Sequence, residues 1–140
     1  PSQAYFGEKD FQQLAIIRDL VRQKSLDILI TGCPIVRESY GLAMSSRNER
    51  LKLQEREAAS VIYDALQTAA KKAAVKKSLN EITQEAVKEI NALENTVVFY
   101  FEFVNARSLE PIETLTTTEN ARIITAVDFK GVRLLDNIGL

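Results

Sequence analysis

The chain has 140 residues, 46% hydrophobic and 26% charged, which is typical of a globular domain that can bury a core. Its net charge of −1 gives no electrostatic reason to expect a nucleic acid or an acidic membrane surface as a partner. No apolar run approaches the about 20 residues of a membrane span, so we expect a cytoplasmic protein without membrane contact. The single cysteine, Cys33, excludes an internal disulfide and is expected to be a buried small apolar residue. The chain has no histidine, so the commonest metal ligand is missing and no protein metal site is expected.

Residues 1–31 have the pattern of a strand, a tight turn at Gly7, a helix and a second strand. Asp10 is the expected N-cap of a helix from Phe11 to about Gln23. Apolar residues recur along one side of this helix, at Leu14, Ile17, Leu20 and Val21. The short apolar run Asp27–Thr31 predicts a buried strand. Together these elements indicate a βαβ-like unit.

Two polar segments follow the strands of this unit. At Gly7–Asp10 the backbone N–H groups of a helix start suit an anion, and Lys9 adds a full positive charge. In the loop Pro34–Asn48, the run Met44–Asn48 places two hydroxyls, a guanidinium and a carboxamide side by side, which can wrap an oxyanion. Helix starts and carboxyl ends of strands meet in such units, so both segments are expected to face one crevice. The alternative is that Asp10 and Ser45 or Ser46 are only helix caps, with Lys9 and Gln13 exposed.

A second region begins near Glu49 with two helical patterns. Apolar residues at helical spacing predict one helix from about Gln54 to Ala74, followed by lysines that are read as a solvated helix end rather than a phosphate-binding patch (Lys71, Lys72, Lys76 and Lys77). The capping box Ser78–Glu81 predicts the start of a second helix. Its expected apolar face consists of Leu79, Ile82, Ala86, Ile90 and Leu93.

The rest of the chain alternates with period two, which predicts about three antiparallel strands. In the first strand, one apolar face is expected to pack in the core rather than stack on bases (Val97, Phe99, Phe101 and Phe103). Ser108–Asn120 is predicted to be a connection with at most one helical turn. A hairpin turn at Lys130–Gly131 should join a strand over Ile123–Phe129 to one over Val132–Ile138. The expected fold class is α+β, with a division into residues 1–48 and 49–140.

Three segments and their spacing resemble the pantothenate synthetases, the ATP-dependent pantoate–β-alanine ligases. They are Gly-Glu-Lys-Asp-Phe-Gln-Gln-Leu (Gly7–Leu14), Gly-Leu-Ala-Met-Ser-Ser-Arg-Asn (Gly41–Asn48) and the closing run Arg133–Asn137. The resemblance covers essentially the whole chain but only the later half of the family's length. It implies that residues 1–48 are the terminal piece of a Rossmann-like nucleotide-binding domain. Residues 49–140 would then be a lid domain, with helices packed on a small antiparallel sheet.

The resemblance also implies roles for individual residues. The ATP-binding segment of the family falls on Gly7, Glu8, Lys9 and Asp10. Its triphosphate-wrapping loop, similar to the Lys-Met-Ser-Lys-Ser loop of class I aminoacyl-tRNA synthetases, falls on Met44, Ser45, Ser46 and Arg47. Val36 matches a position whose backbone contacts the adenine side of ATP, and Gln13 matches a pantoate-binding position. As catalytic groups, Lys9, Ser45, Ser46 and Arg47 would offset charge on the phosphates together with Mg²⁺.

The implied reaction condenses pantoate with β-alanine through a pantoyl adenylate. The family's His-x-Gly-His signature has no counterpart here, and Tyr40 stands where the family commonly has an aspartate. We therefore expect the carboxyl-terminal part of the enzyme, inactive by itself. One alternative is a non-catalytic module that binds another protein or a second copy as a homodimer. Another is a piece of an aminoacyl-tRNA synthetase or of a cytidylyltransferase-like enzyme, which fits Gly7–Gln13 and the closing run poorly.

Overall fold

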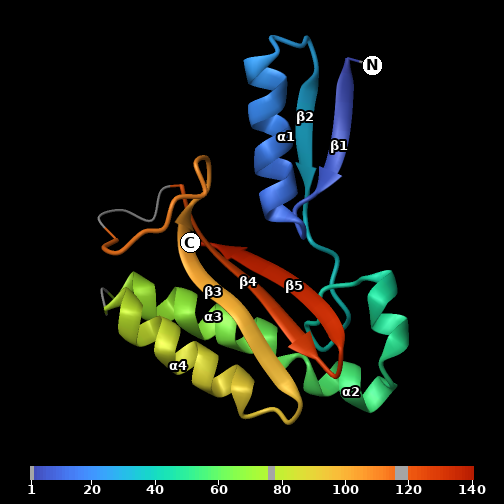
Figure 1. The fold of residues 1–140 in the computed structure, drawn as a ribbon, viewed down its shortest axis with the longest axis vertical. Coiled ribbons are helices and arrows are strands. Elements are labelled where there is room, and N and C mark those ends of the chain that lie inside the picture. Colours follow the sequence, from blue (N-terminus) through green and yellow to red (C-terminus); the bar gives the residue numbers. More distant parts are fainter. Residues whose placement is uncertain (1, 76–77, 116–119) are drawn as a thin grey trace.

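The computed structural model describes residues 2–75, 78–115 and 120–140. In chain order, the elements are β1 (Gln3–Gly7), α1 (Phe11–Gln23), β2 (Leu29–Cys33), the 3₁₀ helix η1 (Ser46–Arg50), α2 (Leu53–Ala58), α3 (Val61–Ala74), α4 (Leu79–Asn91), β3 (Thr96–Asn105), β4 (Ala121–Phe129) and β5 (Val132–Gly139). Their strands form a parallel pair, β1–β2, and an antiparallel sheet in the order β3–β4–β5. Figure 1 shows the β1–α1–β2 unit standing above this sheet, with α3 and α4 on one face of the sheet.

The β1–α1–β2 unit confirms the predicted strand, helix and strand, with Gln3 paired to Leu29 and Gly7 paired to Cys33. Helix α1 has the predicted bounds, but its buried residues are Phe11, Leu14 and Ala15, while Leu20 of the predicted stripe is 48% exposed. Strand β2 begins two residues later than predicted and is not buried. Cys33 at its end is half-buried, so the prediction of a buried cysteine was also wrong.

The main hydrophobic core lies between the antiparallel sheet and the helices α3 and α4. The apolar face predicted for α4 is confirmed for Leu79, Ile82, Ala86 and Ile90, which are all buried, whereas Leu93 lies beyond the end of the helix and is partly buried. Its N-cap is confirmed as well, since the Ser78 hydroxyl accepts a hydrogen bond from the Glu81 N–H. Period-3.6 patterns thus identified the helix faces that build this core.

The single helix predicted over Gln54–Ala74 is instead two helices, α2 and α3. Between them, the Ser60 and Ile62 N–H groups bond to carbonyls three residues back, at Glu57 and Ala59, and this tighter turn interrupts the α-helical spacing. No residue of α2 is buried, whereas α3 buries five, so only α3 belongs to the core layer. In the last turn of α3, Lys72 pairs with the Glu85 carboxylate. Lys76 and Lys77 lie outside the described residues.

The prediction of one apolar face on the first strand of the sheet was wrong for two of its four residues. Phe101 is 4% exposed and Phe103 is 3% exposed, but Val97 and Phe99 are 57% and 51% exposed. The register against β4 shifts between Val98 and Tyr100, so the strand has a bulge that moves the two early residues to the opposite face. There, the guanidinium of Arg133 lies 4.5 Å from the centre of the Phe99 ring, a cation–π contact.

The hairpin between β4 and β5 turns at the predicted residues, with φ of 52° at Lys130 and 79° at Gly131. Positive φ at both positions is the geometry of a two-residue type I′ turn. In the connection predicted over Ser108–Asn120, the described residues 108–115 form no helix, and residues 116–119 lie outside the description. The predicted division between residues 48 and 49 falls inside η1, and it stays a prediction.

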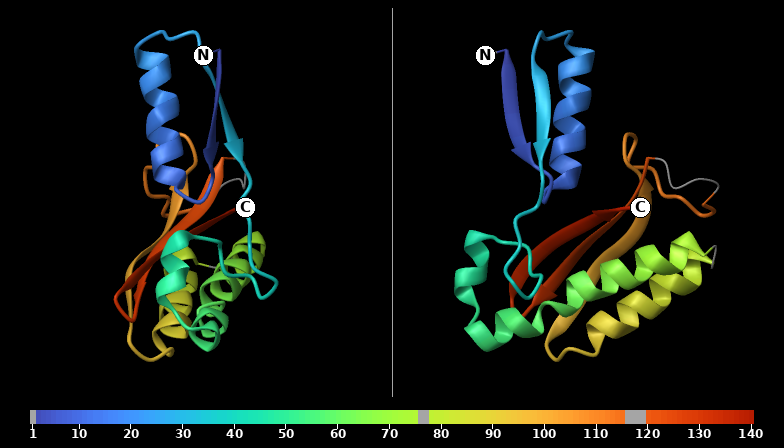
Figure 2. Two further views of the ribbon diagram at one scale, coloured as in Figure 1. Left: turned by 90° about the vertical axis from the view of Figure 1, so that its right-hand side faces the viewer. Right: turned by 180° about the vertical axis from the view of Figure 1, so that it is seen from behind.

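A smaller apolar contact joins the parts of the fold. On the sheet face away from α3 and α4, Phe11 packs with Val104 and Ile124 in a second apolar cluster. The views in Figure 2 show the start of α1 close to that face.

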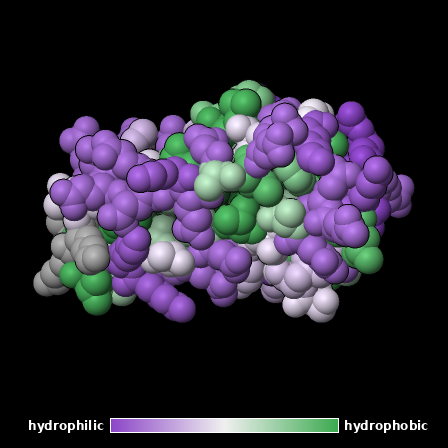
Figure 3. Space-filling view, turned by 90° about the horizontal axis from the view of Figure 1, so that it is seen from below, coloured by the Kyte–Doolittle hydropathy of each residue, from purple (hydrophilic) through white to green (hydrophobic). Residues whose placement is uncertain are grey.

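Hydrophilic residues cover much of the face seen from below, with hydrophobic ones gathered near its middle (Figure 3). No helix in the described part of the chain has both the length and the apolar character of a membrane span.

Candidate functional site

Both predicted anion-binding segments begin at the same end of the parallel strand pair. The Glu8 N–H donates to the Cys33 carbonyl over 2.8 Å, which ties the turn after β1 to the end of β2. Asp10 stands at the N-cap position of α1, but its side chain makes no capping hydrogen bond. The N-cap prediction is therefore right for the position and wrong for the bond, and the carboxylate remains at an exposed site.

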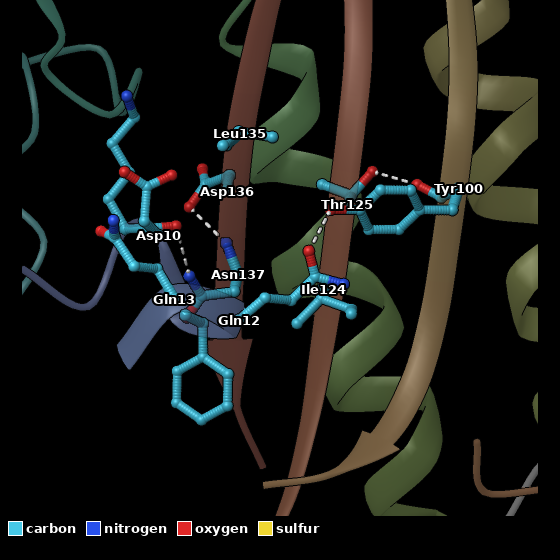
Figure 4. Close-up of a pocket in the computed structure, with 11 residues that line it drawn as sticks. Asp10, Gln12, Gln13, Tyr100, Ile124, Thr125, Leu135, Asp136 and Asn137 are labelled. Carbon is cyan, nitrogen blue, oxygen red and sulfur yellow. Dashed lines mark hydrogen bonds between the residues drawn. The ribbon is translucent and has the colours of Figure 1, made fainter. Parts of the chain in front are cut away.

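A cavity of about 160 Å³ lies between the start of α1 and the three antiparallel strands. Figure 4 shows its lining residues, with Asp10, Gln12 and Gln13 opposite Tyr100 on β3, Thr125 on β4 and Asn137 on β5. The Tyr100 hydroxyl donates to the Gln12 side-chain oxygen over 3.3 Å. The predicted pantoate-binding residue, Gln13, thus lines a crevice between the two halves of the chain.

Lys9 is the cation at the centre of this region. It lines the cavity described above and also a smaller one of about 10 Å³, which Ala43, Asn48 and Asp136 share. Burial lowers the pKa of Lys9, and the neighbouring positive charge of Arg47 lowers it further, while the carboxylates of Asp10 and Asp136 raise it. An anion bound here would relieve the repulsion between Lys9 and Arg47.

The loop from Pro34 to Asn48 folds back on itself before η1. The Met44 N–H donates to the Val36 carbonyl over 2.8 Å, so two predicted ATP-binding positions are neighbours. Ser45 is the N-cap of η1, and its hydroxyl accepts from the Arg47 N–H over 3.2 Å. This confirms the capping interpretation for Ser45, while Ser46 and Arg47 are exposed.

Asn48 fixes the end of this loop from inside. Its side chain is 4% exposed and donates to the Ala43 carbonyl over 3.0 Å. Its Oδ1 atom is buried without a hydrogen-bond partner among the described residues. The adjoining 10 Å³ cavity has about the volume that one water molecule needs, and such a water would satisfy this oxygen. Tyr40, whose role the sequence left open, packs half-buried against the main core.

A buried ion pair connects the loop to β5. Both terminal guanidinium nitrogens of Arg37 donate to the Asp136 carboxylate, over 2.7 and 2.8 Å. The same guanidinium lies 3.7 Å from the centre of the Tyr63 ring and donates to the Gly41 carbonyl. Since Asp136 is 5% exposed, the bidentate geometry and these extra contacts offset the cost of burying its charge.

The next residue of β5, Asn137, connects to the other segment. Its side-chain amide donates to the carbonyls of Glu8 and Lys9, over 2.7 and 3.1 Å. Its oxygen accepts from Arg122, which lies over the Phe11 ring at 4.4 Å, and burial lowers the pKa of that arginine. The sequence placed Asp136 and Asn137 in the closing motif without a role, and it did not predict any role for Arg37 or Arg122. No local sequence pattern marks these four residues as partners, because the residues that they contact are distant in the sequence.

The described residues thus form a mixed α/β protein in which Lys9 lies between the two polar segments, beside a crevice lined by amides and by the carboxylates of Asp10 and Asp136. The model of the pantoate-beta-alanine ligase family matches residues 1–139. The chain therefore belongs to the pantoate-beta-alanine ligase family.

Curated relatives named pantothenate synthetase match along the whole chain. It is 44% identical to the pantothenate synthetase of Flavobacterium psychrophilum, over 100% of this chain and 49% of that protein. The pantothenate synthetase of Bacteroides fragilis is also 44% identical, over 99% of this chain and 49% of the relative. The chain thus spans about half the length of these curated relatives.

Solved structures of proteins with these names are also similar to this chain. The pantothenate synthetase of Thermus thermophilus superposes with a TM-score of 0.91 at 36% identity, over 99% of this chain and 50% of that one. The pantoate-beta-alanine ligase of Francisella tularensis, complexed with beta-gamma ATP and beta-alanine, gives 0.62 at 28% identity, over 99% and 43%. The family match sets aside the aminoacyl-tRNA synthetase and cytidylyltransferase alternatives.

Proposed function

We propose that this chain forms the carboxyl-terminal part of a pantothenate synthetase and binds ATP at the crevice between its two halves. The observation that carries the proposal is that Lys9 lines cavities at the junction of the two segments, with Arg47 of the second segment close enough to lower the pKa of Lys9. Like charges at close range favour a polyanion between them. The solved relative that contains an ATP analogue supports this choice of anion.

In the proposed reaction, the pantoate carboxylate attacks the α-phosphorus of ATP and pyrophosphate leaves, which gives pantoyl adenylate. The β-alanine amine then attacks the acyl carbon of this anhydride, giving pantothenate and AMP. Lys9 and Arg47, with the hydroxyls of Ser45 and Ser46, would offset charge on the phosphates in the first step. Gln13 would hold pantoate through its amide.

The remaining positions of the proposed site act through their backbone or flank the cations. Gly7, Glu8 and Asp10 would form the turn around the phosphates, Met44 would belong to the loop that wraps the triphosphate, and Val36 would lie toward the adenine. The 65% exposure of Val36 and the 46% exposure of Met44 leave both free for such a contact.

Mg²⁺ is proposed as a companion of the nucleotide. In the described ranges, no group of three or more acidic or cysteine side chains is arranged to hold a metal ion. Mg²⁺ needs no such cage when it arrives with a triphosphate, because phosphate oxygens and water fill most of its coordination sphere. Asp10, an exposed carboxylate close enough to Lys9 to raise its pKa, could add a ligand.

The two halves would divide the work. The β1–α1–β2 unit is proposed as part of a Rossmann-like nucleotide-binding domain, completed by the half of the relatives that this chain does not match. Residues 49–140 would be the lid that excludes water from the adenylate. The chain alone would be inactive, and the complete enzyme would act in the cytoplasm.

Calorimetric titration of the chain with Mg-ATP tests the site. An Arg47→Ala variant should lose at least about tenfold in affinity, because it removes one of the two cations proposed to bind the phosphates. Arg50→Ala is the matched control, since Arg50 is an exposed arginine of the same 3₁₀ helix, and it should bind as the unmodified chain does. Equal losses in both variants would reduce the site to general electrostatic attraction.

A second experiment tests the reaction itself. The chain should be fused to the amino-terminal half of the Flavobacterium psychrophilum enzyme, which is 44% identical over the matched part. AMP formation should then require both pantoate and β-alanine. AMP formation that ignores either substrate, or none with a folded fusion that binds ATP, would reject the assignment.

A homodimer or other protein contact is a second candidate function, favoured by one observation. Five large apolar residues of the β1–α1–β2 unit and its turn are at least 48% exposed, namely Tyr5, Ile16, Leu20, Leu26 and Leu29. Exposed apolar residues of this kind are candidates for an interface. Sedimentation of the chain and of the fusion should show whether self-association survives when the second half is present.

A further inference from the structure

We propose that Asp136 and Asn137 of β5 are positioning residues that hold the two proposed ATP-binding segments at a fixed separation. Asn137 holds the turn Gly7–Asp10, and Asp136 holds the loop Arg37–Asn48. The role in ATP binding rests on the proposed function, whereas the restraint on the two segments does not.

Asn137 is suited to hold a backbone turn because all of its side-chain hydrogen-bonding groups are directed. It is 2% exposed, and its two amide protons go to two successive carbonyls, those of Glu8 and Lys9. Carbonyls only accept and the guanidinium of Arg122 only donates, so a flipped amide would lose all three bonds. Arg122 thereby fixes the orientation in which Asn137 grips the turn.

Asp136 holds the loop through Arg37. One carboxylate oxygen accepts from Arg37 and from the Asn137 N–H, both over 2.8 Å, and the other accepts from Arg37 alone. Arg37 passes the restraint on to the Gly41 carbonyl. The Asn137 N–H bond also links the two residues of β5, so both restraints originate at one place on the sheet.

The charges explain why such a restraint is needed. The positive charges of Lys9, in one segment, and Arg47, in the other, repel each other when no anion is bound. Neither segment can relax away if its backbone is tied to the same strand. Preorganisation of this kind reduces the ordering that a ligand must otherwise cause.

Hydrogen exchange on the ligand-free chain tests the restraint. Asn137→Asp keeps an acceptor for Arg122 but loses both donors, so exchange should rise about tenfold within residues 8–14. Asp136→Asn weakens the pair with Arg37, and a similar rise should appear within residues 38–48. The controls are Asn80→Asp, at an exposed position in α4, and Asp128→Asn on β4, which should leave both segments unchanged.

Three outcomes decide the matter. Increases confined to the named segments support the proposal. Unchanged exchange in those segments overturns it. An equal increase over the whole chain, including β3–β5, also overturns it, since the two residues would then contribute only general stability. The Asp136→Asn variant keeps the test decisive if Asn137→Asp does not fold.

Mg-ATP affinity then tests the link to the proposed function. If Asn137 acts by placing Lys9 and its turn, Asn137→Asp should cost about tenfold alone and little in a Lys9→Ala background. Independent, additive losses would contradict positioning. A chain that binds no Mg-ATP while showing the expected exchange pattern would disprove the ATP site as proposed for this chain, and not the restraint.

Discussion

The β1–α1–β2 unit and the α3–α4–sheet unit differ in how they are stabilised. Helix α4 buries Ile82 and Ile90 to 1% and 0% exposure, whereas α1 leaves Ile16 at 61%. The first unit is attached to the second mainly by directed polar contacts, such as Arg37 with Asp136, and by a small apolar cluster around Phe11. Hydrophobic burial therefore concentrates in the second unit, and the candidate site lies where the first unit joins it.

This contrast separates stability from function. Buried apolar area in the α3–α4–sheet unit can supply most of the folding free energy without reference to any ligand. Gly7–Asp10 and Arg37–Asn48, by comparison, need a defined position more than they need burial. Stability measurements on matched variants in the two units can sharpen or break this comparison.

The largest expected effect comes from matched isoleucines. Ile90→Ala should lower the free energy of unfolding by about 4 kcal/mol, because it removes a fully buried side chain and leaves a cavity. Ile16→Ala should change it by less than about 0.5 kcal/mol, since most of Ile16 is exposed. Urea unfolding measures both. A large loss for Ile16→Ala would mean that this face is covered in solution, which would break the comparison.

Two glycines with positive φ give the next largest difference. Gly41→Ala should destabilise by about 2–3 kcal/mol, since φ is 101° and the added Cβ would lie 2.8 Å from the Tyr63 ring. Gly131→Ala, at φ 79° with open space around it, should cost only about 1 kcal/mol. Equal losses in thermal unfolding would show that the loop near Gly41 is not held against Tyr63.

Helix caps predict a smaller effect. Ser78→Ala should cost about 1 kcal/mol, because the Ser78 hydroxyl accepts a hydrogen bond at the start of α4. Asp10→Ala should cost less than half as much, since the Asp10 carboxylate makes no such bond at the start of α1. Chemical denaturation of both variants distinguishes a residue that stabilises a helix start from one whose role is not structural. A full capping loss at Asp10 would favour the purely structural interpretation of that residue.

Regular periodicity explains which parts of the fold the sequence predicted well. The bounds of α1, the buried face of α4 and the turn at Lys130–Gly131 follow from local patterns. The bulge before Tyr100 does not, because one extra residue in a strand reverses the faces without changing the composition. The break between α2 and α3 is similarly local and leaves the apolar spacing almost intact.

The candidate site shows the same limit. Its two polar segments stand out in the sequence because adjacent polar residues follow strands. The side chains that hold them do not, since Arg37 lies 99 residues from Asp136 and Asn137 lies 129 from Glu8. Only the register of β5 in the sheet brings these partners together.

The smallest expected effect is the dependence of stability on pH at Lys9. Its folded-state pKa is lowered by burial, so between that value and the ordinary 10.5 the unfolded chain binds more protons. Stability should therefore rise with pH across this window in the unmodified chain and rise less in Lys9→Met.

A bound polyanion favours the charged lysine, so Mg-ATP affinity should fall over the same window. Opposite signs for stability and affinity, both reduced in Lys9→Met, would assign both effects to one ammonium group. If affinity instead stays constant with pH, Lys9 does not contact the nucleotide, and the polar junction between the two units would serve only to join them.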